Sequence, residues 1–414
     1  MSTPSVTEFR AEARSWLAAR LAPRLDDAGS FGQGSDDVAV FHDLPDDRER
    51  ELIAALASWQ QCKYDAGYVA IDRPADLGGR GLDREYADAF AQEESAFVTP
   101  SGHELVSVTA NLVAPTVALL GSAEQRARFV EPFLRAEELC CQLFSEPGAG
   151  SDLATLGTRA RRDGDEWVIS GQKVWTSGAQ FAAWGELLAR TDPDVPKHAG
   201  ITAFLVPLDA AGIQVRPLRQ MSGGTSFNEV ILDEVRIPDA LRVGDVGGGW
   251  KVALTTLGFE RGAGSGRHDH IGGGFRQLRL LAQWLDLGDD PIVRQRLAQV
   301  YAAERSSALT ALRHQARVQA GASPGPEGSI RKLQWTRTMT LVSDVVTELL
   351  GQRLAADTGE WGTFAWRQHL LGAPGYRIAG GSDEIQRSII GERVLGLPSA
   401  PRVDRNVAWK DLPK

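Results

Sequence analysis

The sequence predicts an α+β protein in which a β domain lies between two helical domains. Apolar residues recur every three or four positions before about residue 138 and after about residue 246, which is the spacing of amphipathic helices. Between these regions, short apolar runs are bounded by Gly, Pro and Asp, as in β-strands. A chain of 414 residues is long enough for two or three domains. We therefore expect a helical domain over 1–138, a β domain over 139–245 and a second helical domain over 246–414.

The N-terminal domain contains several predicted helices. The first begins at Val6, and its apolar residues recur at three and four positions, namely Phe9, Ala13, Trp16, Leu17 and Leu21. Another begins after Ser122, because this hydroxyl can cap a helix and Gln125 stands three residues later, as in a capping box. The predicted helices cover residues 6–21, 48–68, 84–98, 106–120 and 122–138.

The middle domain is predicted to be an antiparallel sheet or barrel. Asp163-Gly164 joins two β-like runs and favours a tight hairpin. Further runs of strand character cover residues 167–169, 187–189, 201–206, 213–215 and 230–232. After Gly249 the chain becomes helical again, and the apolar stripe within 342–350 is typical of a bundle helix.

The bulk composition excludes several classes of protein. A net charge of -9 gives no general attraction for nucleic acid or for an anionic membrane surface. The three cysteines show neither a disulfide framework nor the spacing of a metal site, which suits a reducing cytoplasm. No run is long and apolar enough to span a bilayer, and no N-terminal signal pattern is present. We expect a cytoplasmic protein without membrane insertion, nucleic-acid partner or metal site.

The stretch from Cys140 to Ser177 carries the strongest chemical signal. It contains the turn Ser145–Asp152, read SEPGAGSD, and the segment Gly171–Ser177, read GQKVWTS. Glycines let the main chain approach a ligand closely, hydroxyls add hydrogen-bonding groups, and Trp175 offers a flat apolar face. This combination suits a planar cofactor with polar edges, although an ordinary surface hairpin would have a similar composition.

These two motifs resemble the flavin-contacting segments of the acyl-CoA dehydrogenase family, and the resemblance extends over essentially the whole chain. It implies an N-terminal helical domain, a middle β domain, a C-terminal four-helix bundle and a homo- or hetero-tetramer. It also implies FAD as cofactor, an acyl-CoA substrate and an electron-transferring flavoprotein or similar acceptor. The residues that it places against the flavin are Gln142, Leu143, Ser145, Gly150, Ser151, Trp175, Thr176, Ser177 and Ser382.

The resembled reaction removes an α-proton from an acyl thioester while the β-hydrogen leaves as hydride to flavin N5. It needs a desolvated carboxylate as base and fixed hydrogen-bond donors for the thioester oxygen. Most members carry the base shortly before an Ile-Gln-Arg motif, but the matching position here is Gly380. The main-chain N–H of Gly380 could still donate to the thioester oxygen.

A minority of the family, including isovaleryl-CoA and long-chain acyl-CoA dehydrogenases, carries the base in a Glu-Arg pair on the first helix of the bundle. Glu260-Arg261 fills that place. We therefore expect Glu260 to be the base, Arg261 to support it, and Ser151 with Arg261 to contact the substrate. A solvated helix pair is the plain alternative. Asp383 and Glu384 are competing carboxylates. A base on this helix accompanies branched or bulky acyl groups in the resembled enzymes.

Two motifs for the dinucleotide half of FAD are missing. An Arg-x-x-Phe-Gly motif is replaced within 281–291, and a Gly-Gly-x-Gly-Tyr motif is altered at 349–352. The chain could bind FAD through other residues, share a site with a partner, or hold FAD weakly. Three functions stay open: an acyl-CoA dehydrogenase, a catalytically reduced partner subunit, or a dehydrogenase of carrier-bound acyl groups in secondary metabolism. The glycines at 262–266 and the histidines at 268 and 270 are too incomplete as motifs to indicate a dinucleotide loop or a metal site.

Overall fold

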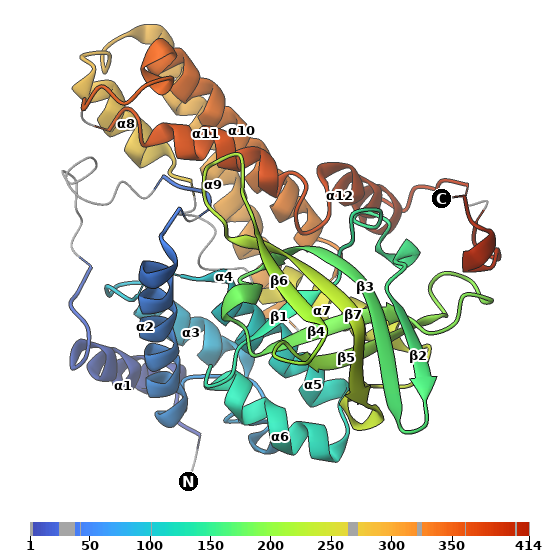
Figure 1. Cartoon of the computed structure of the whole chain (residues 1–414). Helices are drawn as coiled ribbons and strands as arrows, with labels where there is room; N and C mark the ends of the chain where they lie inside the picture. Colours follow the sequence, from blue (N-terminus) through green and yellow to red (C-terminus); the bar gives the residue numbers. More distant parts are fainter. Residues whose placement is uncertain are drawn as a thin grey trace.

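The computed structural model describes residues 3–24, 38–41, 43–100, 102–263, 272–320, 325–360, 362–401 and 404–413, with the main chain alone at 260–263 and 318–319. The predicted alternation of helical, β and helical regions is confirmed (Figure 1). The glycine-rich and histidine-containing segment at 264–271 lies outside the described residues.

Helices form the N-terminal region. They are α1 (Val6–Ala18), α2 (Asp46–Asp65), η1 (Ala75–Leu77), α3 (Arg84–Glu94), α4 (Glu104–Ser107), η2 (Val108–Val113), α5 (Ala114–Leu120) and α6 (Ala123–Leu134). The predicted capping box is present at the start of α6, where the Ser122 hydroxyl accepts from the N–H of Gln125 and the Gln125 side chain accepts from the N–H of Ser122.

The helix expected over 106–120 differs from the prediction, because its centre, η2, is a π-helical turn. Thr109 lies within it, and its hydroxyl donates to the Leu105 carbonyl at 2.8 Å and accepts from the Cys140 N–H at 2.9 Å. A side chain that bonds both its own helix and a neighbouring strand can widen the helical turn locally. The π turn thus fixes the helix against the strand that precedes the SEPGAGSD motif.

The middle region is a mixed sheet. Its strands are β1 (Cys140–Leu143), β2 (Arg159–Asp163), β3 (Glu166–Ser177), β4 (Trp184–Arg190), β5 (Ile201–Pro207), β6 (Ile213–Leu218), β7 (Phe227–Pro238) and β8 (Arg242–Val243). Their order is β6-β7-β3-β2-β4-β5-β8, with β1 beside β4. The predicted hairpin joins β2 to β3, and Gly164 adopts a φ of +69° in its turn. The sheet departs from the antiparallel expectation where β1 pairs with β4 in parallel.

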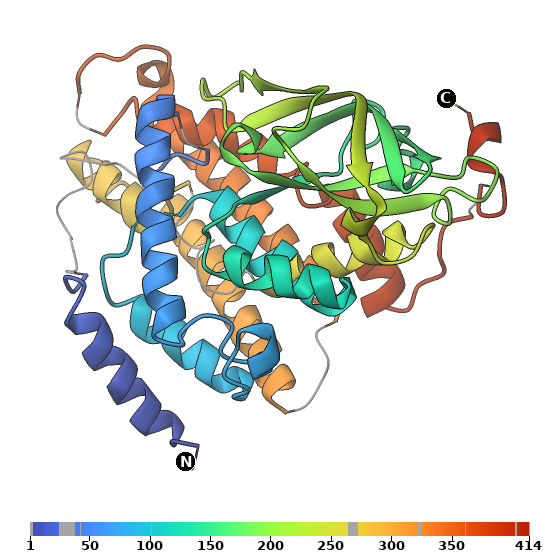
Figure 2. The same cartoon turned by 60° about the horizontal axis from the view of Figure 1, so that its bottom comes forward.

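Two apolar cores cover the two faces of this sheet. One contains side chains of α5, α6 and η2, one face of β1, β4 and β5, and Val252 and Ala253 of α7 (Gly249–Ala263). The other face packs on Ile53 and Leu56 of α2. Figure 2 shows α5, α6 and α7 gathered beneath the sheet. The first core therefore joins all three regions of the chain.

The C-terminal region is helical. After α7 it contains α8 (Phe275–Trp284), α9 (Pro291–Gln319), α10 (Gly328–Leu350), α11 (Trp366–Tyr376) and α12 (Asp383–Ile389). The predicted stripe on α10 is confirmed, since Val342, Val345 and Val346 are buried against α8 and α9. The chain end returns to the sheet, where the Trp409 N–H donates to the Val195 carbonyl at 2.9 Å. Within the described residues, no helix is long and apolar enough to cross a bilayer.

Candidate active site

The structure joins the two motifs singled out in the sequence. The Lys173 ammonium donates to Glu146 Oε1 at 2.7 Å and to the Phe144 carbonyl at 3.1 Å. The Val174 N–H donates to the Ser145 carbonyl at 2.9 Å. The SEPGAGSD turn after β1 is therefore fastened to the end of β3.

Glu146 is held as a carboxylate inside this junction. Its two oxygens also accept the N–H groups of Gly157 and Thr158 at 2.7 and 2.9 Å. Burial alone would raise the pKa of Glu146, but the charge and hydrogen bond of Lys173 and these N–H donors hold that pKa below its ordinary value. The pair is internal, because the Lys173 side chain is fully buried. Its role is to fix the turn rather than to exchange protons.

Trp175 projects from an irregular point of β3. It adopts a φ of +61°, a left-handed conformation that costs a non-glycine residue about 1–2 kcal/mol. The pairing of β3 with β7 slips between Lys173 and Thr176, so Trp175 sits in a bulge. Its side chain is 61% exposed, although its edge contacts Phe227 with ring centroids 6.1 Å apart. A left-handed backbone and an exposed ring distinguish Trp175 from its neighbours on β3, and its contact with a ligand stays a prediction.

The remaining residues predicted for the flavin lie around this junction. Gln142 Nε2 and Thr176 Oγ1 are buried and have no hydrogen-bond partner among the described residues. Gly150 and Ser151 are exposed in the turn, and a Cβ on Gly150 would meet nothing within 4 Å. The Leu143 side chain is fully buried on the face of the sheet opposite to Gln142. Only its main chain is left to contact a ligand. Ser145 and Ser177 are half-buried.

Gly380 and Ser382 lie in the turn between α11 and α12. Gly380 is exposed with a φ of +62°, and among the described residues its N–H meets no acceptor. The Gln386 side chain donates to the carbonyls of Gly380 and Gly381 at 3.0 and 3.1 Å, which fixes this turn. Ser382 is the N-cap of α12 and accepts from the Ile385 N–H at 3.3 Å. The turn can present a main-chain donor.

The two competing carboxylates have other surroundings. Asp383 is buried, and burial would raise its pKa, but hydrogen bonds from Thr336 at 2.8 Å and Arg377 at 3.0 Å lower that pKa overall. Glu384 has a 74% exposed side chain and pairs with Arg387 at 2.9 Å. Asp383 is paired with residues of two other helical segments, and Glu384 faces solvent. Neither carboxylate is both desolvated and unpaired, as a base should be.

Glu260 and Arg261 belong to α7, but their side chains lie outside the described residues. The turn of α7 that carries them follows directly after a buried polar contact of the same helix. Position 260 follows Thr256 by four residues, so both lie on one face of α7. Thr256 is fully buried and its hydroxyl donates to Glu186 Oε1 of β4 at 2.7 Å. Sequence reasoning missed this contact, although an acidic residue inside the apolar run WGELLAR was a visible signal.

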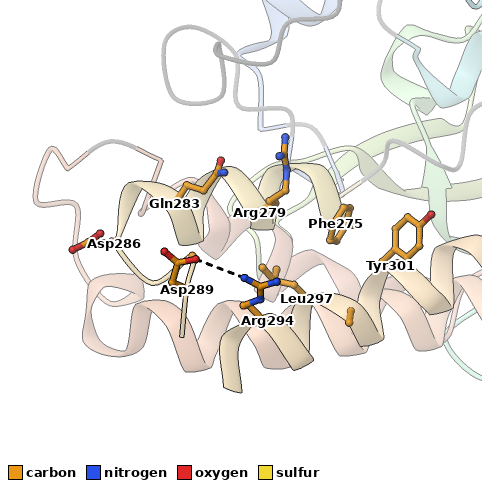
Figure 3. A pocket seen from close by; sticks show the side chains of 10 residues that line it. Phe275, Arg279, Gln283, Asp286, Asp289, Arg294, Leu297 and Tyr301 are labelled. Atoms are coloured by element: carbon orange, nitrogen blue, oxygen red, sulfur yellow. Dashed lines mark ion pairs between the residues drawn. The ribbon is translucent and has the colours of Figure 1, made fainter. Parts of the chain in front are cut away.

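The segment that replaces the Arg-x-x-Phe-Gly motif borders a separate cavity. This cavity has a volume of about 660 Å³, and its lining residues come from α8, α9 and the connection between them (Figure 3). Its charged lining consists of Arg279, Arg294, Asp286 and Asp289, and the last of these pairs with Arg294 at 3.6 Å. The charges of two carboxylates cancel those of two guanidiniums here. The cavity therefore lacks the net positive charge that would bind a pyrophosphate. The described residues therefore fit the isoalloxazine half of FAD better than its dinucleotide half.

Known proteins share this architecture and sequence. Three family models match in chain order: the acyl-CoA dehydrogenase N-terminal domain at residues 3–137, the middle domain at 141–235 and the C-terminal domain at 247–395. Acyl-CoA dehydrogenase IpdE1 of Mycobacterium tuberculosis is 38% identical over 398 residues, covering 95% of this chain and 98% of that protein. The chain belongs to the acyl-CoA dehydrogenase family. Members of this family are FAD-dependent oxidoreductases, and the resemblance seen in the motifs is confirmed.

Other acyl-CoA dehydrogenases give the same assignment. Acyl-CoA dehydrogenase FadE34 of Mycobacterium tuberculosis is 41% identical over 361 residues, which span 87% of this chain and 48% of that protein. Among solved structures, the Tcur3481-Tcur3483 steroid ACAD has a TM-score of 0.73 at 29% identity and covers 97% of this chain and 99% of its own. The ChsE4-ChsE5 complex from Mycobacterium tuberculosis has a TM-score of 0.71 at 29% identity, with coverage of 97% and 99%.

Proposed function

We propose that this chain oxidises an acyl-CoA thioester to the 2-enoyl-CoA in a site between β1, β3, α7 and the α11–α12 turn. The supporting observation is the junction of the two motifs, where the Lys173–Glu146 pair orders the turn beside two unpartnered buried groups, Gln142 Nε2 and Thr176 Oγ1. Bound FAD would take the β-hydrogen as hydride. Gln142, Ser145, Thr176 and Ser382 would hold its ring system, as would Trp175.

The chain's own residues would handle the proton and the developing charge. Glu260 would take the α-proton from the substrate, and Arg261 would support its orientation and ionised state. The Gly380 N–H would donate to the thioester oxygen, which gains negative charge as the α-proton leaves. Ser151, exposed at the tip of the turn, would contact the substrate.

A ring-bearing acyl group is the proposed substrate class. In the resembled enzymes a base on the first bundle helix accompanies branched or bulky acyl groups, and one similar solved structure is described as a steroid ACAD. An electron-transferring flavoprotein or a similar acceptor would reoxidise the flavin. The three described cysteines are all free thiols, as suits a reducing cytoplasm.

Anaerobic flavin bleaching tests this function. The purified chain, reconstituted with FAD, would be mixed with straight-chain, branched and ring-bearing acyl-CoAs, and with the same acyl groups on an acyl carrier protein. We expect ring-bearing CoA thioesters to bleach the flavin fastest. Bleaching by the carrier thioesters alone would overturn the choice of CoA, and no bleaching by any thioester would overturn the function.

The second candidate is a partner subunit whose site is completed by another chain. The cavity between α8 and α9 has cancelling charges and does not suit a pyrophosphate, so another chain would have to supply that contact. The similar ChsE4-ChsE5 structure is described as a complex, which also favours this candidate. The long helix α9 also exposes large apolar side chains, namely Ile292, Tyr301, Leu309 and Leu312. Light scattering with flavin quantification separates the candidates. One FAD per chain in a homo-oligomer supports the enzyme, and a colourless chain that binds FAD only with a second family member supports the partner.

A further inference from the structure

Glu186 is an acid without a charged partner in the core that joins the three regions. It lies in β4, is 1% exposed, and is paired in register with Gln142 of β1 and Leu205 of β5. Its side chain shares a sheet face with Cys140 and Leu188, which belong to this apolar core. Among the described residues, no Lys, Arg or His forms an ion pair with it. A carboxylate in such a place would be strongly disfavoured.

A short chain of hydroxyl groups connects Glu186 to two helices. Thr256 of α7 donates to Glu186 Oε1 at 2.7 Å, and the hydroxyls of Thr256 and Thr116 lie 2.9 Å apart. The Thr116 hydroxyl also lies 2.8 Å from the Leu112 carbonyl, and its single proton is shared between this carbonyl and the Thr256 oxygen. The three side chains are at most 1% exposed, so water does not compete for these bonds. Sheet, α5 and α7 therefore meet at one polar point inside an apolar core.

Thr256, the member of this cluster on α7, lies one helical turn before Glu260, the proposed base. Four residues of α-helix advance the chain by about 6 Å along the helix axis, so positions 256 and 260 are adjacent on one face. Beyond residue 263 the next described helix is α8, which is a separate element. The Thr256–Glu186 bond is thus the last described polar contact that fixes this face of α7 before Glu260.

We propose that Glu186 is a positioning residue: through Thr256 it fixes the turn of α7 that presents Glu260 to the substrate. This inference rests on the proposed function of Glu260. It assigns to the reaction a second glutamate that does not touch the substrate. Its effect requires a neutral side chain, since a charge at Glu186 would repel a Glu260 carboxylate one turn away and would draw water into the core.

The surroundings of Glu186 set the pH at which this positioning fails. Burial raises the pKa of Glu186 to about 8, and the hydrogen bond from Thr256 lowers it only in part. On β1, the neighbouring Cys140 thiol has a pKa raised by burial and by Glu186, so it stays neutral over the same range. The residues facing Glu186 from α5 and β5, Thr116 and Leu205, do not titrate. Glu186 is therefore neutral at pH 7 and ionises at about pH 8.

Hydrogen exchange tests the positioning without any turnover. The amides of residues 250–260 would be followed by mass spectrometry at pH 6.5 and pH 9 in the wild type, Glu186→Gln, Thr256→Val and Thr256→Ser. At pH 9 we expect these amides to exchange at least about tenfold faster in the wild type than in Glu186→Gln, because the opened segment lets Glu186 release its proton at a pKa well below the folded value of about 8, which favours opening. At pH 6.5 we expect faster exchange in Thr256→Val, and wild-type exchange in Thr256→Ser, which keeps the hydroxyl. Equal exchange in all four proteins at both pH values would overturn the inference.

The pH profile of flavin reduction adds a readout that a purely structural role would not change. In the wild type we expect the rate at saturating substrate to fall with a midpoint near pH 8, and in Glu186→Gln we expect this decline to disappear. Thr256→Val should lower that rate with little change in substrate affinity. Identical profiles for the wild type and Glu186→Gln would contradict the role. If no thioester reduces the flavin while the exchange differences appear, the proposed function fails and the Glu186–Thr256 contact stands.

Discussion

Glu146 and Glu186 are two inward-facing glutamates of the same domain with opposite electrostatic surroundings. Glu146 meets a buried ammonium at 2.7 Å and two main-chain N–H groups, and its pKa lies below the ordinary value. Glu186 meets one hydroxyl and no described cation, and burial raises its pKa to about 8. Only the first is a carboxylate at neutral pH. The difference shows that the residue type alone does not decide the charge: burial raises the pKa of both glutamates, and only Glu146 has a cation and N–H donors that outweigh it.

The two glutamates therefore affect stability in opposite directions as pH changes. The stabilisation from Glu146 is present above the pKa of an unfolded glutamate and is lost as pH falls through its lowered folded pKa. The stabilisation from neutral Glu186 is present below the unfolded pKa and is lost as pH rises towards about 8. One glutamate fastens a turn beside the proposed flavin site, and the other sets the position of a helix.

Removing the cation from the Glu146 pair should have the largest effect. Lys173→Met leaves a carboxylate with no ammonium in a mostly buried site, and we expect a loss of about 3–5 kcal/mol in the free energy of unfolding. Urea denaturation measures it. The matched control is Lys410→Met, whose pair with Asp194 is more than half exposed on both sides, so this variant should show no measurable loss. Equal losses in the two variants would contradict a buried, unscreened pair.

Replacing Glu186 by a neutral isostere should give a smaller, pH-dependent change. Between pH 5.5 and pH 7.5 the folded wild type retains a proton that its unfolded chain has released, so its stability falls with pH. Glu186→Gln should remove this slope, so its stability advantage over the wild type should grow by roughly 2–3 kcal/mol from pH 5.5 to pH 7.5. Chemical denaturation at several pH values measures the difference. Exposed Glu384→Gln is the control and should show no such trend.

Relieving the strain at Trp175 should have the smallest effect on stability. Glycine adopts a φ of +61° without steric cost, so Trp175→Gly should gain up to about 1 kcal/mol in stability while losing bound FAD. The melting temperature and the flavin retained after gel filtration measure the two effects. The control is Glu234→Gly, because Glu234 is an exposed residue with a φ of +50° on the paired strand β7. That variant should keep its flavin, and equal flavin loss in both would argue against a ligand-facing Trp175.

Local patterns predicted the parts of the molecule that depend on neighbours in sequence. The capping box at Ser122 and the hairpin at Gly164 each follow from residues within a few positions, and both are confirmed. The two motifs on either side of that hairpin could be recognised as belonging together because their spacing resembled a known family. Their assigned contacts with FAD stay predictions.

The Glu186 cluster could not be predicted in this way. Thr116, Glu186 and Thr256 are separated by 70 to 140 positions and meet only because α5 and α7 pack on the same face of the sheet at β4. The π-helical turn at η2 likewise depends on the contact between Thr109 and the distant Cys140. Such features need the packing of three regions, whereas a sequence pattern reports mainly on one element at a time.

The rate of flavin reduction in Glu260→Gln, compared with Glu384→Gln over a panel of acyl-CoAs, tests the central claim most directly. Loss of a general base lowers the rate by about 10²–10⁴-fold, and we expect this loss in Glu260→Gln with unchanged flavin content. Glu384→Gln should reduce its flavin at the wild-type rate, since that side chain is exposed and paired with Arg387. A normal rate in Glu260→Gln, or a large loss in Glu384→Gln, would contradict the relocation of the base to α7.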